Sequence, residues 1–471
     1  MSYHIPFEVS DYGYAQAMSA LQATKKFGIQ PLLESVSEML LELKNPDECF
    51  KSVQIAGTNG KTSTSRYTAA FLREEGLKTA LYTSPELVKY TERMEIDGVP
   101  VTEEVFGHGI AAAVAAGKRV NAARIAAGRR AYDITEFDLL TVAALTVFAE
   151  AGVDVAVLEC GMGGRWDATS AAKNITSVAI TGIGLDHTRI LGNTLEEIAG
   201  EKAAIIQRDR SCVLGVGTAT PVSVEEVFLS RAAEQGVVPT LLRATDVCEV
   251  AGEMQEGMVR HHADLPCATF AITKHPARLG FPLELTVKTP RATHGDLAAL
   301  KPRYQAANIA LALCLAEDFL DRPLDADKAF DAAIGCPTPG RFQLLRPDPL
   351  VLIDAAHNPQ SVATFLTAIR DVEPNPLHRP KLLTAVLADK DVFGIAELLA
   401  KEFPAVIVTQ TDSARALPAD ELAKIYRDLG AQVEGVFPTV EKAVCALSHE
   451  SYVACGTITL AGEVMSSLRG L

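Results

Sequence analysis

The chain has 471 residues and a formal net charge of −15, from 44 basic and 59 acidic side chains. This length predicts two or three domains, each able to bury a core of its own. The acidic balance argues against a nucleic-acid partner and leaves small anionic substrates to local basic residues. Nine cysteines without a C-x-x-C pair indicate reduced thiols, and neither a signal peptide nor a run of about 18 apolar residues is apparent. We therefore expect a cytoplasmic protein without a membrane-spanning segment.

Short apolar runs rich in β-branched residues alternate with longer amphipathic segments, which predicts βαβ units and an α/β fold with mainly parallel sheets. The expected strands are 53–56, 79–82, 153–159, 177–183, 350–354, 382–387, 405–409 and 432–436. Between about 210 and 295 the segments shorten, which predicts antiparallel strands at a sheet edge, 270–272 and 283–287 among them. Prolines and glycine cluster at 337–340 before a fresh strand, so we place a domain boundary at about residue 338.

A glycine-rich turn follows the first apolar run and reads Gly57-Thr-Asn-Gly-Lys-Thr-Ser63. Gly57 and Gly60 let the backbone approach an anion, and the N–H groups of the helix that follows attract phosphate. Lys61 adds a positive charge, and Thr62 can reach a magnesium ion. The strict phosphate-loop pattern requires glycine where Ile55 stands, so this is a shorter variant, and an ordinary tight turn is the alternative. The turn predicts a nucleoside triphosphate site.

Two further strands of the first half end in polar residues. Glu159 follows the run 153–157 and precedes glycines 161, 163 and 164, whereas Asp186 and His187 follow the strand 177–183. Ligands in open parallel sheets bind beyond the carboxyl ends of the strands, so we expect Lys61, Glu159 and His187 near one another. A structural glycine turn is the alternative for the first run, and an Asp-His pair alone is a weak signal.

The same pattern appears in the second half of the chain. Arg341 follows Pro339 and Gly340, and the strand 350–354 ends in Asp354, with His357 and Asn358 in the turn behind it. Asn358 precedes a proline that can begin a helix, so an N-cap is its structural alternative.

Two helical segments have both a structural and a functional interpretation. The Ala- and Arg-rich segment 111–132 predicts a basic helix, which is either a solvated helix or a surface that faces a substrate. Lys202 lies in a helix expected to begin near Thr194, and by itself it would be read as a solvated helix residue.

Taken together, these motifs resemble the folylpolyglutamate synthase and dihydrofolate synthase family of the ATP-dependent Mur ligase superfamily. The resemblance covers about residues 50 to 465. It is carried by Gly57 to Thr62, Thr83-Ser-Pro85, Glu92-Arg93, the glycine run from Glu159 to Thr169, Leu185-Asp-His-Thr188, Glu201-Lys-Ala203, Pro339-Gly-Arg341, the Asp354 to Pro359 stretch, Asp389-Lys-Asp391, and Gly456-Thr457 with Ala461-Gly-Glu463.

The resemblance implies an N-terminal P-loop ATPase domain, residues 1–338, and a smaller C-terminal Rossmann-like domain, residues 339–471, with a cleft between them. In this family ATP phosphorylates the carboxylate of a pteroate or folate substrate, and the amine of L-glutamate then displaces the phosphate from the acyl phosphate. The resemblance also implies a monomer.

It further implies roles for individual residues. The residues implied in catalysis are Lys61, His187, Lys202 and His357. Those implied in nucleotide binding are Gly57, Thr58, Asn59, Gly60, Lys61, Thr62, Ser63, Asn308, Arg341 and Asp354. Mg²⁺ would bind Ser84 and Glu159 at one site, and His187 with a carbamylated Lys202 at a second. A carbamate turns a repelling ammonium into an oxygen ligand.

Four positions depart from the family pattern. Thr62 and Ala355 each stand where the family usually has glycine, and Glu86 and Tyr304 each stand where it usually has histidine. These departures bear on substrate preference, and they leave open whether dihydropteroate, reduced folate or both are accepted. Other interpretations are a Mur ligase that acts on a different carboxylate, a non-catalytic nucleotide-binding homologue and a phosphotransferase.

Overall fold

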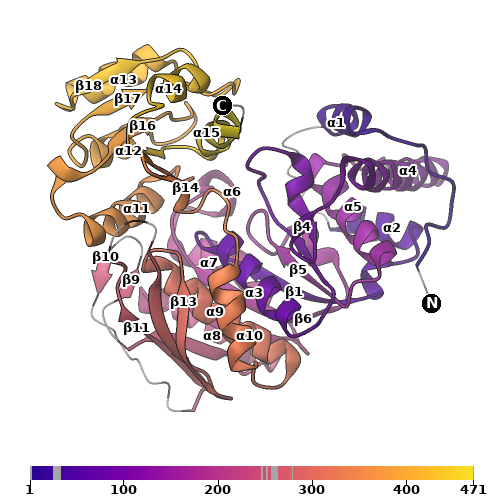
Figure 1. Ribbon diagram of the computed structural model, residues 1–471. Helices are drawn as coiled ribbons and strands as arrows, with labels where there is room; N and C mark the ends of the chain where they lie inside the picture. Colours follow the sequence, from indigo (N-terminus) through magenta and orange to yellow (C-terminus); the bar gives the residue numbers. More distant parts are fainter. Residues whose placement is uncertain are drawn as a thin grey trace.

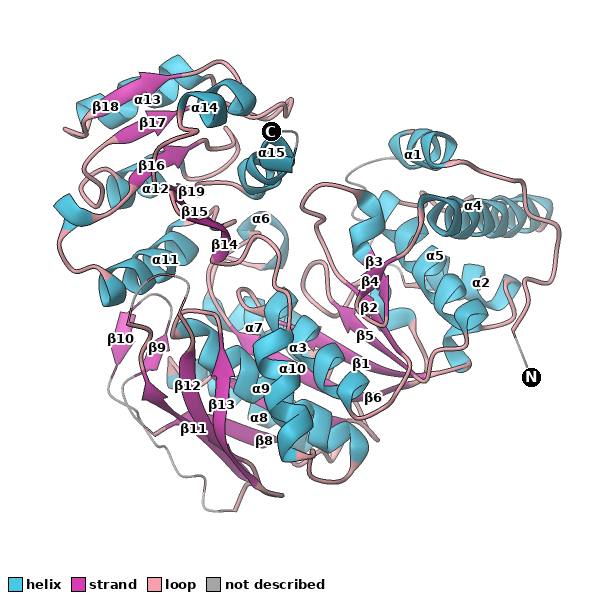
Figure 2. Ribbon diagram, viewed as in Figure 1, coloured by secondary structure: helices cyan, strands magenta, loops and turns pink. Residues whose placement is uncertain are grey.

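The protein folds around two β-sheets, each covered by helices (Figures 1 and 2). The structure is a computed structural model and describes residues 3–24, 33–245, 248–250, 253–255, 262, 264–277, 279 and 281–469. The larger sheet belongs to the first two thirds of the chain, and the smaller sheet begins at Gln343. The expected α/β class with two sheets of unequal size is thereby confirmed.

Among the described residues the larger sheet has eleven strands, in the order β13-β12-β11-β8-β7-β6-β1-β5-β2-β3-β4. The strands from β11 to β2 in this order pair in parallel, and both edges are antiparallel. The bounds are β1 (Lys51–Ala56), β2 (Thr79–Tyr82), β3 (Met94–Ile96), β4 (Val99–Pro100), β5 (Val155–Glu159), β6 (Ile175–Gly182), β7 (Ser211–Gly217), β8 (Thr240–Ala244), β11 (Cys267–Lys274), β12 (Leu283–Lys288) and β13 (Thr293–Ala299). A separate antiparallel pair is formed by β9 (Cys248–Val250) and β10 (Glu253–Gln255).

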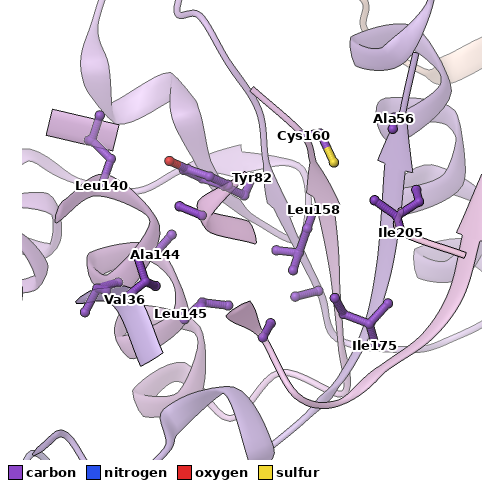
Figure 3. Packing of buried hydrophobic residues seen from close by; sticks show 14 of the residues in the cluster. Val36, Ala56, Tyr82, Leu140, Ala144, Leu145, Leu158, Cys160, Ile175 and Ile205 are labelled. Atoms are coloured by element: carbon purple, nitrogen blue, oxygen red, sulfur yellow. The ribbon is translucent and has the colours of Figure 1, made fainter. Parts of the chain in front are cut away.

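Helices cover both faces of the larger sheet, and β1 supplies side chains to both cores. Val53 and Ile55 pack against α3, α9 and α10, whereas Ala56 packs on the opposite face with residues of α4 and α5. Figure 3 shows part of this second core, with Leu158 of β5 and Tyr82 of β2 among residues of α5. The helices are α1 (Tyr14–Gln22), α2 (Glu34–Glu42), α3 (Lys61–Glu74), α4 (Glu103–Ala126), α5 (Glu136–Ala151), α6 (Thr188–Leu191), α7 (Leu195–Ala203), α8 (Val222–Gln235), α9 (Tyr304–Leu320) and α10 (Ala326–Gly335).

The smaller sheet has six strands in the described part of the chain, in the order β14-β15-β19-β16-β17-β18. All neighbours pair in parallel except β14, which is antiparallel to β15. The elements are β14 (Gln343–Pro347), β15 (Leu350–Ile353), α11 (Pro359–Val372), β16 (Lys381–Thr384), α12 (Val392–Leu399), β17 (Val406–Val408), α13 (Ala419–Asp428), β18 (Val433–Val436), α14 (Val440–Ala446), β19 (Tyr452–Cys455) and α15 (Ile458–Arg469).

The eight expected strands are all present, with bounds shifted by a few residues, but the expectation for residues 210–295 was only partly right. The runs 270–272 and 283–287 do pair antiparallel, in β11 and β12. The first part of this region instead continues the parallel sheet through β7 and β8, which α8 connects. The segments in this region are short, so the sequence did not reveal the βαβ unit of β7, α8 and β8. Periodicity also does not show which strands are neighbours in a sheet.

The basic helix expected at 111–132 differs in extent and in surroundings. It is the end of α4, which begins at Glu103 and stops at Ala126. Arg119 and Arg124 form ion pairs with Glu42 and Glu38 of α2, so this part of α4 is bound to a neighbouring helix. Within the described part of the chain, no helix combines the length and apolar composition needed to cross a membrane.

Candidate functional site

A cleft of about 340 Å³ lies between the part of the chain that forms the larger sheet and the part that forms the smaller sheet, and both contribute to its walls. The first part of the chain supplies the glycine-rich turn, the ends of β5 and β6, and the start of α9. The second part supplies the turn before β14 and the loops behind β15, β16, β17 and β19. Residues from both parts therefore surround one space.

The glycine-rich turn is shaped by close packing against β6 and α9. Gly57 has a φ of 149°, and a Cβ atom there would lie 1.8 Å from Thr181 Oγ1. Gly60 has a φ of 87°, and a Cβ atom would lie 2.5 Å from Asn308 Oδ1. Both positions thus require glycine because of conformation and space. The result is a tight loop that leads directly into α3, a helix start of the kind that binds phosphate.

Lys61 is the first residue of α3 and lies over this loop. Its Nζ atom donates hydrogen bonds to Gly57 O and Thr58 O, each at 3.0 Å. The ammonium group lines the cleft together with the loop. It is therefore placed to exchange backbone carbonyls for the phosphate oxygens of a nucleotide.

Glu159 ends β5 beneath the same loop, and its side chain is almost fully buried. Its Oε1 accepts a hydrogen bond from Thr62 Oγ1 at 2.9 Å, and its Oε2 accepts one from Ser84 N at 3.4 Å. Burial raises the pKa of Glu159 above its usual value, and the nearby Lys61 ammonium opposes that rise. A desolvated carboxylate beside a hydroxyl is an oxygen-rich environment that fits Mg²⁺, because this ion prefers oxygen ligands and needs few carboxylates.

His187 follows β6, lines the cleft and has a φ of 51°. Its backbone N–H donates to Asp186 Oδ1 at 2.9 Å, and its Nε2 lies 3.8 Å from Asp186 Oδ2. Burial lowers the pKa of His187, against the attraction of Asp186. This shift favours the neutral form of the ring.

Lys202 is outside the lining of the cleft, but its ammonium group bonds the same carbonyl oxygen of the glycine-rich turn as that of Lys61. Lys202 is buried in α7, and its Nζ donates to Gly57 O at 2.8 Å. Burial, with repulsion from Lys61, lowers the pKa of Lys202 to about 7. The sequence had identified this lysine by resemblance only, and the structure makes it a support of the glycine-rich turn.

Hydrogen bonds join α9 to the first turn of α3. Gln305 Nε2 donates to Ser63 Oγ at 3.0 Å, and Asn308 Nδ2 donates to Gln305 Oε1 at 2.8 Å. Thr64 Oγ1 donates to Asn308 Oδ1 at 3.4 Å. Asn308 is thereby fixed at the wall of the cleft beside Gly60.

The second part of the chain places Arg341, Asp354 and His357 on the facing wall. Asp354 Oδ2 accepts from Phe342 N, and Asp354 Oδ1 accepts from Ala356 N, both at 2.8 Å. Burial raises the pKa of Asp354, which Arg341 opposes. His357 Nδ1 donates to Ala355 O at 2.9 Å, and burial lowers its pKa to about 4, so its Nε2 is an unprotonated acceptor.

A side-chain hydrogen bond also joins the first part of the chain directly to the second. Asn59 Nδ2, in the glycine-rich turn, donates to Gln360 Oε1 of α11 at 2.8 Å. Gln360 lies against Gly184, where a Cβ atom would approach Oε1 to 2.2 Å.

Most residues singled out from the sequence thus border one cleft: Thr58, Asn59, Gly60, Lys61, Thr62, Ser63, Ser84, Glu159, His187, Asn308, Arg341, Asp354 and His357. Lys202 is outside this lining and bonds Gly57 O, which also accepts from Lys61. Among the described residues, no three His, Cys, Asp or Glu side chains gather as a metal cluster. Asn358 is the N-cap of α11, where its Oδ1 accepts a hydrogen bond from Ser361 N. This is the structural role that the sequence offered as the alternative for Asn358.

Two residues that depart from the family pattern, Glu86 and Tyr304, form side-chain hydrogen bonds. Glu86 Oε2 accepts from Arg93 Nε at 2.5 Å, and the Arg93 guanidinium lies over the Tyr90 ring. Tyr304 Oη donates to Asp354 Oδ2 at 3.2 Å.

The sequence analysis did not predict two positively charged side chains that line the cleft. Lys390 follows β16, and Arg415 follows β17 and pairs with Asp389 at 3.1 Å. The rule that ligands bind beyond strand ends could have found Lys390, since Asp389-Lys-Asp391 comes just after an expected strand. Arg415 is seven residues beyond its strand and gave no such signal.

Comparison with known proteins matches two family models to the chain. The Mur ligase middle domain matches residues 55–219, and the Mur ligase glutamate ligase domain matches residues 340–458. A relative from Mycobacterium tuberculosis, "Dihydrofolate synthase/folylpolyglutamate synthase", is 34% identical over 84% of this chain and 77% of its own length. A Haloferax volcanii "Probable bifunctional folylpolyglutamate synthase/dihydropteroate synthase" is 33% identical over 89% of this chain, which spans only 46% of that longer relative.

Solved structures agree with these matches. The Mycobacterium tuberculosis folylpolyglutamate synthase complexed with ADP superposes with a TM-score of 0.82 at 28% identity and covers 97% of this chain and 98% of its own. A bifunctional folylpolyglutamate synthase/dihydrofolate synthase with Mn, AMPPNP and L-glutamate bound gives a TM-score of 0.74 at 26% identity, over 97% of this chain and 98% of its own.

Proposed function

We propose that this chain, which belongs to the folylpolyglutamate synthase and dihydrofolate synthase family of ATP-dependent ligases, performs its reaction in the cleft between the two sheets. The family reaction is the ATP-dependent addition of L-glutamate to a folate-type carboxylate. The observation that best supports this location is that Lys61 and Thr62 face Arg341, Asp354 and His357 across one space. A domain boundary at residue 338, just before Arg341, would let the two walls close on a nucleotide.

The phosphates of ATP would lie in the loop from Gly57 to Ser63. Lys61 would neutralise the β- and γ-phosphate oxygens, and the N–H groups at the start of α3 would bind them. Asn308, Arg341 and Asp354 would hold the rest of the nucleotide, because they line the facing walls. In this arrangement the γ-phosphate would lie between the two walls of the cleft.

A divalent cation would be held by Glu159 and Ser84, with the Thr62 hydroxyl beside them. When bound, it would neutralise the negative charge of the phosphates. We further propose a second cation site at His187 and a carbamylated Lys202, whose lowered pKa leaves a neutral amine able to react with carbon dioxide. Lys202 would have to leave Gly57 O to reach that site.

The acceptor carboxylate would attack the γ-phosphate, with release of ADP, and the amine of glutamate would then attack the acyl phosphate and release inorganic phosphate. His357 Nε2 is unprotonated and can accept a hydrogen bond from the incoming amine. Closure of the cleft would exclude water, which would otherwise hydrolyse the acyl phosphate. Lys390 and Arg415 border the same space with positive charge that suits a carboxylate substrate.

The acceptor is a pteroate or folate small molecule, and we propose a cytoplasmic monomer with no nucleic-acid partner. The acidic net charge of −15 supports the last point. The free thiols of the described cysteines support a reducing compartment.

The test is ADP release by the purified protein with Mg-ATP and L-glutamate, measured with dihydropteroate, with tetrahydrofolate and without acceptor, together with product mass. We expect acceptor-dependent release and a mass increase of one glutamyl unit. Release that neither acceptor stimulates would contradict the proposal and direct the search to other carboxylates.

A further inference from the structure

The peptide group that joins Arg341 to Phe342 is bonded at both of its polar ends. Its carbonyl oxygen accepts from Lys301 Nζ at 3.1 Å. Its N–H donates to Asp354 Oδ2 at 2.8 Å, and the Tyr304 hydroxyl donates to the same oxygen at 3.2 Å. Lys301 and Tyr304 belong to the junction between β13 and α9, so one domain fixes a peptide at the beginning of the other.

This peptide has a conformation that needs such support. Phe342 has a φ of 46°, in the left-handed region that bulky residues rarely adopt. Its ring is 6% exposed and packs against Phe365, with ring centroids 5.9 Å apart. A residue in such a conformation persists only when its surroundings determine it, and here the buried ring and the two hydrogen bonds do so.

The orientation of this peptide decides where Arg341 points, because a rotation of the peptide would swing the adjacent side chain. Arg341 lines the cleft, as does Asp354. We propose that Lys301 and Tyr304 are positioning residues for nucleotide binding, which hold the 341–342 peptide so that Arg341 faces the nucleotide. Lys301 acts on the peptide carbonyl, and Tyr304 acts through Asp354, the acceptor of the peptide N–H. This inference rests on the proposed function, which gives Arg341 that role.

Lys301 has the surroundings expected of such a support. Its ammonium donates to a carbonyl at a domain junction, and burial lowers its pKa to about 8. Arg303, between the two positioning residues, pairs with Asp371 of α11 at 2.9 Å. The junction therefore touches the second domain at three neighbouring residues, which fixes its own position relative to the peptide.

The test measures the affinity of Mg-ADP by calorimetry, and kcat and KM for ATP, in the full chain. The variants are Lys301→Met, Tyr304→Phe, Arg341→Met and the double variant Lys301→Met with Arg341→Met, with exposed Lys424→Met as the matched control. We expect Lys301→Met to weaken ADP binding about tenfold and Tyr304→Phe about threefold, chiefly in KM for ATP. In the Arg341→Met background, Lys301→Met should add less than about twofold, because it acts through Arg341.

Independent effects of Lys301→Met and Arg341→Met, or wild-type ADP affinity in Lys301→Met, would overturn the inference. Wild-type affinity in Arg341→Met would instead show that the proposed nucleotide role of Arg341 is wrong. Thermal unfolding verifies that each variant is folded. If Lys301→Met does not fold, Tyr304→Phe combined with Arg341→Met gives the same coupling test, because it removes only a hydroxyl.

Discussion

Thr62 Oγ1 donates a hydrogen bond to Glu159 Oε1 at 2.9 Å and so joins the first turn of α3 to the end of β5. Thr62 is the second residue of α3, and Glu159 is the last residue of the fully buried strand β5. Thr62 is one of the departures from the family pattern, and its hydroxyl is thus directed at the carboxylate that we assign to the cation. Substitution of Glu159 can therefore test the catalytic role of this residue and its effect on protein stability in separate measurements.

Glu159→Gln should lower turnover about a hundredfold or more at a fixed Mg²⁺ concentration while raising stability at neutral pH. The folded-state pKa of Glu159 is raised by burial. The protonated side chain therefore stabilises the protein at pH values below the pKa of the unfolded state, and this contribution is lost as the pH rises through the pKa of the folded state. An uncharged glutamine avoids that loss. Thermal unfolding at pH 7.5 and a Mg²⁺ titration of activity check both effects, and a less stable variant with normal Mg²⁺ dependence would contradict them.

Lys61→Met should lower kcat/KM for ATP about a thousandfold and leave the fold intact, since the ammonium acts on phosphate and contributes little to packing. The matched control is Lys118→Met, on the exposed side of α4. Steady-state kinetics and thermal unfolding distinguish the two. A Lys61→Met protein with near-normal turnover would show that the phosphate loop has been wrongly assigned.

Lys202 should carry a carbamate. Its pKa of about 7 leaves the amine largely neutral at pH 8, the form that reacts with carbon dioxide. Carbon NMR with labelled bicarbonate should show a carbamate resonance in the wild type that Lys202→Arg lacks, and activity should fall when bicarbonate is removed. A spectrum without that resonance at pH 8, in the presence of Mg²⁺ and ADP, would leave Lys202 as a support of the glycine-rich turn only.

Asp318 should make stability depend on pH far from the cleft. Burial raises its pKa to about 6, against the attraction of Arg291. A raised folded-state value means stability that is present below about pH 4 and is lost as pH rises through about 6. Relative to wild type, Asp318→Asn should therefore gain about 2 kcal/mol of unfolding free energy between pH 4 and 7. Denaturant unfolding at both pH values measures this difference, and parallel pH profiles would refute it.

The sequence predicted well which residues line the cleft wherever a single rule sufficed. Lys61, Glu159, His187 and Asp354 each follow an apolar strand, and parallel strands bring their carboxyl ends to one edge. It did not predict where the Lys202 ammonium points, because the direction of a helical side chain depends on which face of α7 packs inward. It also missed Arg415, since a residue deep in a loop reaches the cleft only through the relative placement of the two sheets.

Tertiary packing also explains why the sequence predicted the wrong pairing for β7 and β8. The strand β7 and its partner β8 looked like edge strands because they lie in a region of short segments, yet they pair in parallel with their neighbours. Register and neighbour choice come from tertiary packing, which local periodicity does not contain.

The hydrogen bond from Asn59 Nδ2 to Gln360 Oε1 joins the glycine-rich turn to α11. The Asn59 amide has two N–H donors, so a nucleotide bound as we propose could accept from one while Gln360 accepts from the other. If the contact with Gln360 changes the affinity for a nucleotide, the nucleotide must change the strength of that contact by the same factor. A nucleotide in the turn would then act on the contact between the two parts of the chain through one side chain, that of Asn59.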